Sequence, residues 1–188
     1  MADIKAIKGT NNTTYSIVDR YSEWGGYNIL PGTAFWTCMA NRGNLVINGN
    51  EASISANNTK NKSEVIPCSL GDVFTMSVDV KADEEKTYQE GTEYFWLIDL
   101  LNSSESRVDY IVNPTTTLTT DWQRVFWTFE ITNSNIKKFT FGFRNYISSP
   151  PTVTMRHLKI EKGHKATDWS PCWIDIFTYN NETITMNI

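Results

Sequence analysis

The sequence predicts an all-β protein, built as an antiparallel two-sheet β-sandwich with jelly-roll topology. Short apolar segments recur along most of the chain, and turn-forming residues separate them at the spacing typical of sandwich strands. Residues 72–81 alternate between apolar and polar side chains, which is the two-residue period of a strand with one buried face. No long segment favours a helix, and strands do not alternate with helical patterns as they do around parallel sheets.

The first part of the chain, residues 1–26, differs in pattern from the rest and is expected to lie outside the main domain. Ile7 and Tyr15 lie on either side of the turn-forming run Gly9-Thr10-Asn11-Asn12. This arrangement indicates two short extended pieces around a turn.

Residues 27–171 show the succession of short strands and define one sandwich domain. The expected strands span residues 44–47, 52–55, 64–69, 72–81, 94–101, 108–112, 123–131, 138–147 and 153–160. The polar stretches at 82–92 and 113–121 are expected to be solvated loops between them.

Within several strands the pattern shows which residues enter the core. Large apolar residues share one face in three strands, namely Phe74, Met76, Val78 and Val80; Val125, Trp127, Phe129 and Ile131; and Phe139, Phe141 and Phe143. In residues 153–160 the apolar pattern changes phase near His157. Residues 94–101 are apolar on both faces, so the outward face of this strand stays open.

The end of the last strand predicts a closing segment. Gly163 supplies turn geometry at no steric cost, so the strand is expected to end there. Trp169 comes shortly before Pro171 and is large enough to cap the hydrophobic core.

The composition fits a single domain with a large core. The chain has 188 residues, of which 40% are hydrophobic. Its formal net charge of −4, without a basic block, lacks the electrostatic footprint of a nucleic-acid-binding protein. No apolar run is long enough to span a bilayer, and the first residues lack the apolar core of a signal peptide. We therefore expect synthesis in the cytoplasm, no nucleic-acid partner and no membrane insertion.

The cysteines and acidic residues predict no metal centre or other cofactor. Cys38, Cys68 and Cys172 have neither C-x-x-C spacing nor a nearby histidine, so buried thiols are expected. Acidic and amide oxygens would suit a structural calcium ion, but no Asp-x-Asp-x-Asp loop supports one.

Catalytic motifs are missing as well. His157 and His164 lie in no known catalytic pattern. Asp79, Asp99 and Asp109 are the strand carboxylates, and a glycosidase would need two such groups about 5–10 Å apart. Nothing beyond their positions on strands indicates that two of these carboxylates lie together. The sequence therefore favours a protein that is not an enzyme, with glycoside hydrolysis as the less favoured alternative.

Both ends of the main domain resemble one family. Residues 28–33, Asn-Ile-Leu-Pro-Gly-Thr, and residues 161–169, Glu-Lys-Gly-His-Lys-Ala-Thr-Asp-Trp, resemble the two ends of jelly-roll domains in bacteriophage and prophage tail proteins. Those domains are similar to carbohydrate-binding modules and galactose-binding domains. Residues 8–19 resemble the opening of phage tail and fibre proteins, which implies that residues 1–26 attach the module to something larger. An ordinary edge hairpin is the equal alternative.

The resemblance implies a non-catalytic virion protein of the tail, baseplate or fibre. Its sandwich would bind host cell-surface polysaccharide during adsorption, and its other partners would be virion proteins and further copies of itself, with a trimer as one form. The alternative is a purely structural virion subunit that decorates the capsid or joins the baseplate. Residues 172–188 depart from the family, because the Asn180-Asn181 turn between apolar pieces predicts an extra hairpin.

A sugar site needs flat aromatic rings and side chains that hydrogen-bond hydroxyl groups. The face of 138–147 opposite the phenylalanines carries Arg144 and Tyr146, and the outward face of 72–81 carries Asp79. If these two strands are neighbours, the three side chains line one groove. Trp96 is the expected platform, and Trp24, Trp36 and Trp122 are alternatives. The expected ligand-binding residues are Trp96, Arg144, Tyr146, Asp79 and Trp36.

Overall fold

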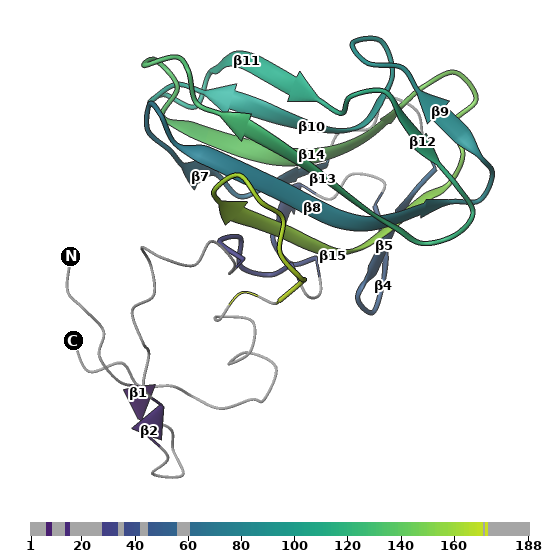
Figure 1. Ribbon diagram of the computed structural model, residues 1–188, viewed down its shortest axis with the longest axis horizontal. Helices are drawn as coiled ribbons and strands as arrows, with labels where there is room; N and C mark the ends of the chain where they lie inside the picture. Colours follow the sequence, from purple (N-terminus) through teal and green to yellow (C-terminus); the bar gives the residue numbers. More distant parts are fainter. Residues whose placement is uncertain are drawn as a thin grey trace.

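The computed structural model describes residues 28–33, 36–41, 45–55, 61–170 and 172, and the backbone of short strands at 7–8 and 14–15. These residues contain strands and turns but no helix. Most of the strands form two antiparallel sheets packed face to face (Figure 1). The predicted all-β sandwich is therefore confirmed.

The two sheets are named after their central strands. The β10 sheet has the order β11-β10-β14-β6-β3, with β7 also paired to β14. Its strands are β3 (Met39–Asn41), β6 (Asn61–Ser63), β7 (Ile66–Pro67), β10 (Tyr94–Leu101), β11 (Arg107–Val112) and β14 (Lys138–Tyr146). The β8 sheet has the order β13-β8-β15-β5-β4. Its strands are β4 (Val46–Asn48), β5 (Glu51–Ile54), β8 (Val73–Ala82), β13 (Gln123–Glu130) and β15 (Val153–Lys162).

Two further pairs complete the described strands. β9 (Lys86–Tyr88) and β12 (Thr116–Leu118) form a two-stranded ribbon inside the two stretches that the sequence predicts as loops. β1 (Ile7–Lys8) pairs antiparallel with β2 (Thr14–Tyr15), as the turn between them predicts. Apart from Cys172, the hairpin predicted at 172–188 lies outside the described residues.

The core lies between the sheets and consists largely of aromatic rings. Phe74 of β8 packs on Phe139 of β14, with ring centroids 4.8 Å apart. Phe141 and Phe143 come next on the same face of β14 and are fully buried. The face predicted from the alternation is therefore the face that enters the core. Burying one such side chain contributes about 1.5–3 kcal/mol.

The phase change predicted near His157 is also present. The pairing of β15 with β8 shifts between Arg156 and Lys159, and His157 has a positive φ of 55°. The irregularity turns Lys159 to the outer face of the sheet while Leu158 and Ile160 stay in the core.

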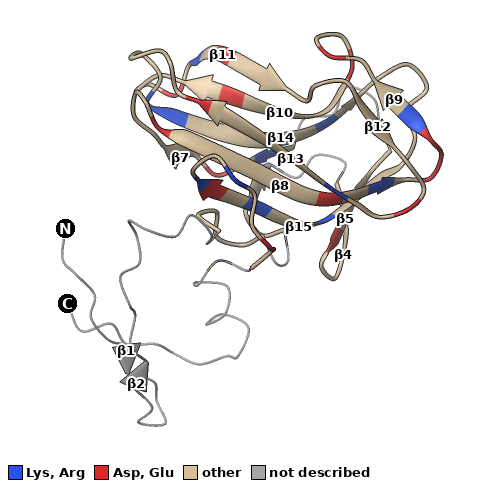
Figure 2. Cartoon of the chain, in the orientation of Figure 1, with Lys and Arg blue, Asp and Glu red and all other residues tan. Residues whose placement is uncertain are grey.

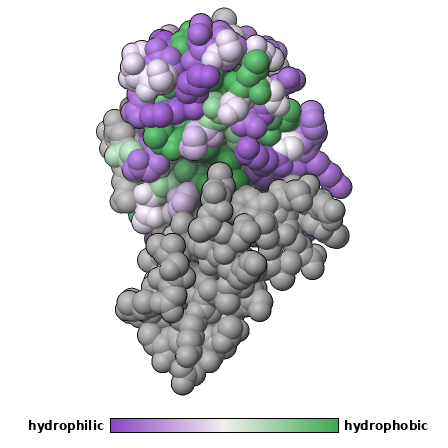
Figure 3. All heavy atoms as spheres, turned by 90° about the vertical axis from the view of Figure 1, so that its left-hand side faces the viewer, coloured by the Kyte–Doolittle hydropathy of each residue, from purple (hydrophilic) through white to green (hydrophobic). Residues whose placement is uncertain are grey.

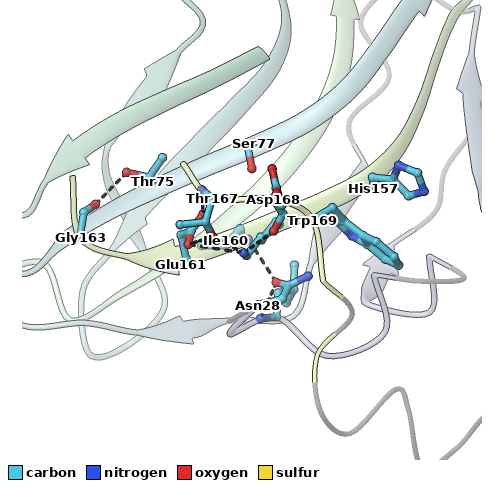
Figure 4. Close-up of polar contacts among 12 residues, drawn as sticks. Asn28, Thr75, Ser77, His157, Ile160, Glu161, Gly163, Thr167, Asp168 and Trp169 are labelled. Carbon is cyan, nitrogen blue, oxygen red and sulfur yellow. Dashed lines mark hydrogen bonds and ion pairs between the residues drawn. The ribbon is translucent and has the colours of Figure 1, made fainter. Parts of the chain in front are cut away.

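The segment after β15 lies across the outer face of the β8 sheet, and we call residues 163–169 the terminal clasp (Figure 4). Gly163 begins it at a φ of 110°, and its carbonyl accepts a hydrogen bond from Thr75 (2.7 Å). The backbone and hydroxyl of Thr167 donate to the Glu161 carboxylate, both at 2.8 Å. These bonds hold the segment flat on the sheet.

Trp169 does not cap the core, contrary to expectation. Its ring stacks on His157 (4.5 Å between centroids), and its indole nitrogen donates to the Leu158 carbonyl (3.3 Å). Because the clasp crosses the outer surface, its tryptophan is half-buried outside the sheet rather than between the sheets.

The two family-like segments meet at this point. The Asn28 side chain donates to the Leu158 carbonyl (2.9 Å) and accepts from the Ile160 amide (3.1 Å). The start of the domain is thus bonded to its last strand, beside the contact that Trp169 makes with the same carbonyl (Figure 4).

The remaining sequence predictions concern thiols and membranes. Cys38, Cys68 and Cys172 are buried, as predicted. Within the described residues, no helix has the length and apolar character needed to cross a membrane.

Candidate functional site

The outer face of the β10 sheet carries a pair of stacked tyrosines. Tyr94 at the start of β10 pairs with Tyr146 at the end of β14, and their rings lie 5.1 Å apart at an angle of 30°. The Arg144 guanidinium lies over both rings, 4.8 Å from Tyr146 and 5.5 Å from Tyr94. Such offset ring pairs and cation–π contacts fix side chains in one arrangement.

The pairing of β10 with β14 is irregular next to this pair. Tyr94 pairs with Tyr146 and Trp96 pairs with Phe143, so Phe95 of β10 lies opposite two residues of β14, Arg144 and Asn145. The Phe95 amide donates to the Asn113 side chain (3.0 Å). Phe95 and Trp96 both turn into the core, and Tyr94 is left on the outer face.

Asp99 lies at the centre of the same face. It is opposite Thr140 of β14 and Tyr110 of β11 in the strand registers. Its carboxylate is buried and forms ion pairs with Lys62 of β6 (3.1 Å) and Arg107 of β11 (3.7 Å). The two cations come from strands on opposite sides of Asp99, so one carboxylate positions both.

Exposure varies sharply across this face. Leu97, Asp99 and Thr140 in the middle are buried, whereas Tyr110 and Tyr146 at its sides are exposed. We call this set of side chains, from β6, β14, β10 and β11, the tyrosine face. Its members are Lys62, Tyr94, Leu97, Asp99, Arg107, Tyr110, Thr140, Gly142, Arg144 and Tyr146.

The chemistry of the tyrosine face suits hydrogen bonding and ring packing. Burial raises the pKa of Tyr94, and the nearby Arg144 charge opposes this only in part. The Tyr94 phenol therefore stays neutral at physiological pH and keeps its hydroxyl proton. Figure 2 shows a basic segment on β14, an acidic one on β10, and one of each kind on β11.

Two of the predicted ligand residues lie together on the tyrosine face. Arg144 and Tyr146 are neighbours there, on the face of β14 opposite the buried phenylalanines. The structure places them as the alternation predicts.

The predicted tryptophan platforms are wrong, because both rings are buried. Trp96 lies in the core with its ring 4.4 Å from Trp127, on the same inward face of β10 as Ile98 and Leu100. Trp36 is fully buried against Phe143, and its indole nitrogen donates to the Asn50 carbonyl (2.9 Å). Neither ring offers a face to a ligand.

Asp79 is not part of a groove with Arg144 and Tyr146, because β8 belongs to the other sheet. On the outer face of that sheet its carboxylate binds Arg124 (2.9 Å) and His157 (2.7 Å), and Arg156 lies 3.6 Å away. Burial alone would raise the pKa of Asp79, but the hydrogen bonds from Arg124 and His157 outweigh it and leave the pKa lowered.

Trp122 lies near this network and is covered by cations. The Arg156 guanidinium lies 4.1 Å from its ring centroid and the Lys81 ammonium 4.7 Å. These contacts make Trp122 part of the Asp79 network. Trp24, the remaining alternative platform, lies outside the described residues.

Asp79 and Asp99 are not arranged as an acid and base around one ligand. Asp79 and Asp99 lie on the outer faces of different sheets, and Asp99 is paired with two cations. In the part of the chain that the structure describes, no group of three or more His, Cys, Asp or Glu side chains is placed to hold a metal ion.

Sequence reasoning missed Lys62, Tyr94, Arg107 and Tyr110 as members of the face. In residues 107–112 the alternation places Tyr110 on the face opposite to Asp109 and Ile111. This pattern was the signal from which the outward position of Tyr110 could have been predicted. Lys62 had none, because β6 is too short for its period to be read.

Comparison with known proteins addresses the fold. No protein-family model matches the sequence, and no curated protein does. The second N-terminal cellulose-binding domain of Cellulomonas fimi β-1,4-glucanase C is 10% identical in sequence, with a TM-score of 0.52; the match covers 74% of this chain and 97% of that one.

Two other solved structures match with lower TM-scores. A structure described as "CBM4 structure and function" is 15% identical over 68% of this chain and 81% of that one, with a TM-score of 0.47. The tripod (BppUct-A-L) from the baseplate of bacteriophage Tuc2009 is 18% identical over 100% of this chain and 75% of that one, with a TM-score of 0.48. The chain therefore has the β-sandwich fold of a carbohydrate-binding module, as its cellulose-binding neighbour shows.

Proposed function

We propose that the chain is a non-catalytic carbohydrate-binding protein and that its ligand lies on the tyrosine face. The observation that carries the proposal is the stacked pair of Tyr94 and Tyr146 under Arg144, beside the exposed Tyr110. Flat rings pack against the C–H faces of sugars, and nearby charged donors bind their hydroxyl groups. The tyrosine face combines both on one rigid sheet.

The arrangement of Asp99 supports the proposal. Its ion pairs hold Lys62 and Arg107 at fixed positions above the sheet, so less side-chain freedom is lost when a ligand binds. Sites on strands are also held more precisely than sites on loops.

We further propose that the protein belongs to a phage virion and binds host surface polysaccharide during adsorption. The support is the resemblance of residues 28–33 and 161–169 to the ends of phage tail modules. In the structure these two segments are bonded to each other through Asn28, which agrees with their forming the boundary of one module.

The proposal is tested by binding to purified bacterial envelope polysaccharides on a glycan array. Replacing Tyr146 or Tyr110 by alanine removes an exposed ring, and we expect each change to weaken binding about tenfold, or about 1.4 kcal/mol. Phe126→Ala is the matched control, because Phe126 is an exposed ring on β13 in the other sheet.

The control should bind like the wild type, and thermal unfolding should show that all variants are folded. No binding of the wild type to any glycan would contradict the proposal. Equal loss in Phe126→Ala would place the site elsewhere.

A structural virion subunit is the second candidate. Exposed apolar side chains favour it, since Phe126 on β13 is 58% exposed and Val46 on β4 is 68% exposed. The end of the sandwich seen in Figure 3 also carries hydrophobic surface among hydrophilic side chains. An oligomer in light scattering that Phe126→Asp dissociates, without loss of any glycan binding, would assign protein contacts to the surface around Phe126 on β13.

A further inference from the structure

The tyrosine face carries an excess of positive charge, and this bears on the ligand class. Lys62, Arg107 and Arg144 are cationic, whereas Asp99 is the carboxylate among the members of the face. The face is thus positive although the whole chain has a formal net charge of −4.

Among the described residues, the other charges near the face lie off its outward surface. Lys138 and Glu105 at the end of the strands pair with each other at 2.6 Å. Asp109 lies opposite Leu100, a core residue, so its position on β11 belongs to the inward register. Asp99 balances one charge of the Lys62 and Arg107 pair, so these three residues alone leave one positive charge.

The cations remain accessible. The side chains of Lys62 and Arg107 are 40% and 53% exposed, whereas that of Asp99 is 1% exposed. A ligand on this face therefore meets the two cations before the carboxylate that holds them. A second anion between Lys62 and Arg107 would gain charge-assisted hydrogen bonds, which are the stronger kind.

Gly142 brings the cations of two strands close together. It lies opposite Leu97 of β10 and Lys62 of β6, and on its own strand it stands between Thr140 and Arg144. A Cβ atom at this position would lie 2.9 Å from the Asn61 backbone oxygen, so β6 and β14 approach closely here.

We propose that the glycan bound by the tyrosine face is acidic, with sugar units that carry a carboxylate or a phosphodiester. This inference rests on the proposed function and names its ligand class. Lys62, Arg107 and Arg144 bind the anionic groups, while the exposed Tyr110 and Tyr146 pack against the sugar rings. Tyr94 is buried and supports the Tyr146 ring. A neutral polymer would use the rings but not the excess charge.

The test compares acidic and neutral polymers by affinity electrophoresis and calorimetry on the full chain. The probes are polygalacturonate, poly(glycerol phosphate) teichoic acid, galactan and hydroxyethyl cellulose. We expect at least one acidic polymer to bind about tenfold more tightly than the neutral ones. That binding should weaken steadily when salt rises from about 50 to about 500 mM, because salt screens exposed charges.

Variants locate the charge effect on the face. Arg107→Gln should lower affinity for the acidic polymer about fivefold to tenfold, and Arg107→Lys, which keeps the charge, should recover most of it. Lys165→Gln is the control, because Lys165 is an exposed cation on the terminal clasp of the other sheet. It should bind like the wild type.

Each result has a distinct meaning. Preference for the carboxylate or the phosphodiester polymer identifies the source of the anion. Equal, salt-insensitive binding of neutral and acidic polymers would overturn the acidic ligand but leave carbohydrate binding intact. An equal loss of affinity in Lys165→Gln would show that the preference for acidic polymers comes from the overall charge of the protein. That result would also overturn the acidic ligand of the tyrosine face. Binding to no polymer would overturn both proposals.

Discussion

Asp79 shows how a side chain that resembles a ligand group can instead be part of the fold. It receives hydrogen bonds from Arg124 and His157 and lies near Arg156, all on the outer face of the β8 sheet. These partners keep its carboxylate ionised and tie β13 and β15 to β8. Its role is therefore a stabilising one that depends on pH.

We expect Asp79→Asn to lower the free energy of unfolding by about 1–3 kcal/mol at pH 6, because charged hydrogen bonds are lost. The pKa of Asp79 is lower in the folded protein than the ordinary value of 3.8. Its contribution is thus present above about pH 4 and is lost as the pH falls through the folded pKa. The difference between wild type and variant in urea unfolding should shrink below about pH 4.

Asp121→Asn is the control, since Asp121 is an exposed carboxylate before β13. It should not show this pH-dependent difference. If the difference in the free energy of unfolding between Asp79→Asn and the wild type stays constant down to about pH 2, the ionised carboxylate does not stabilise the fold.

At the scale of strands, the tyrosine face depends on how closely β14 approaches β6. A Cβ atom on Gly142 would lie 2.9 Å from the backbone oxygen of Asn61 and 3.3 Å from the Leu97 side chain. The first contact is too short and involves backbone, so an alanine at this position would push β6 away from β14. Lys62 on β6 would move with it.

Gly142→Ala should therefore lower stability by about 1–3 kcal/mol, the usual range for overpacking. It should also weaken glycan binding, because Lys62 is displaced. Thermal unfolding and the calorimetric affinity test both effects. Leu97→Ala in the same background should not restore stability, since the backbone contact remains; full recovery would show that only the side-chain contact matters.

At the scale of the whole molecule, the two outer faces differ. One carries the tyrosine face, and the other carries the Asp79 network and the terminal clasp. Asn28 and Trp169, near the two ends of the domain, both bind the Leu158 carbonyl. The segments that enter and leave the domain thus meet on the β8 sheet, away from the face proposed for the ligand.

A buried ion pair holds the clasp. Lys159 and Glu161 lie 3.5 Å apart with fully buried side chains, and the Lys159 ammonium also donates to the Asp168 carbonyl (2.8 Å). Burial lowers the pKa of Lys159, and Glu161 opposes that shift.

Lys159→Met should lower the free energy of unfolding by about 3–5 kcal/mol, because it leaves a buried carboxylate without its cation. The double variant Lys159→Met and Glu161→Leu should regain most of this loss. Lys162→Ala removes the exposed pair with Asp72 and should cost less than about 1 kcal/mol. A double variant as unstable as Lys159→Met alone, in urea unfolding, would contradict the role of the pair.

Much of the fold follows from local patterns in the sequence. The alternation in β8, β13 and β14 correctly gives the faces that enter the core, and the phase change at His157 is visible in the sequence. Short strands such as β3, β9 and β12 were not predicted, because two or three residues show no period.

The sequence by itself determined the fold class, the strand faces that enter the core and the closing turn at Gly163, because periodicity and turn chemistry act between neighbouring residues. It also placed Arg144 and Tyr146 on one outward face. Only the tertiary structure decided that Asp79 lies in the other sheet and that Phe95 joins Trp96 in the core while Tyr94 stacks on Tyr146 at the outer face. Strand order and bulges depend on contacts between distant segments, and those contacts leave no local period to read.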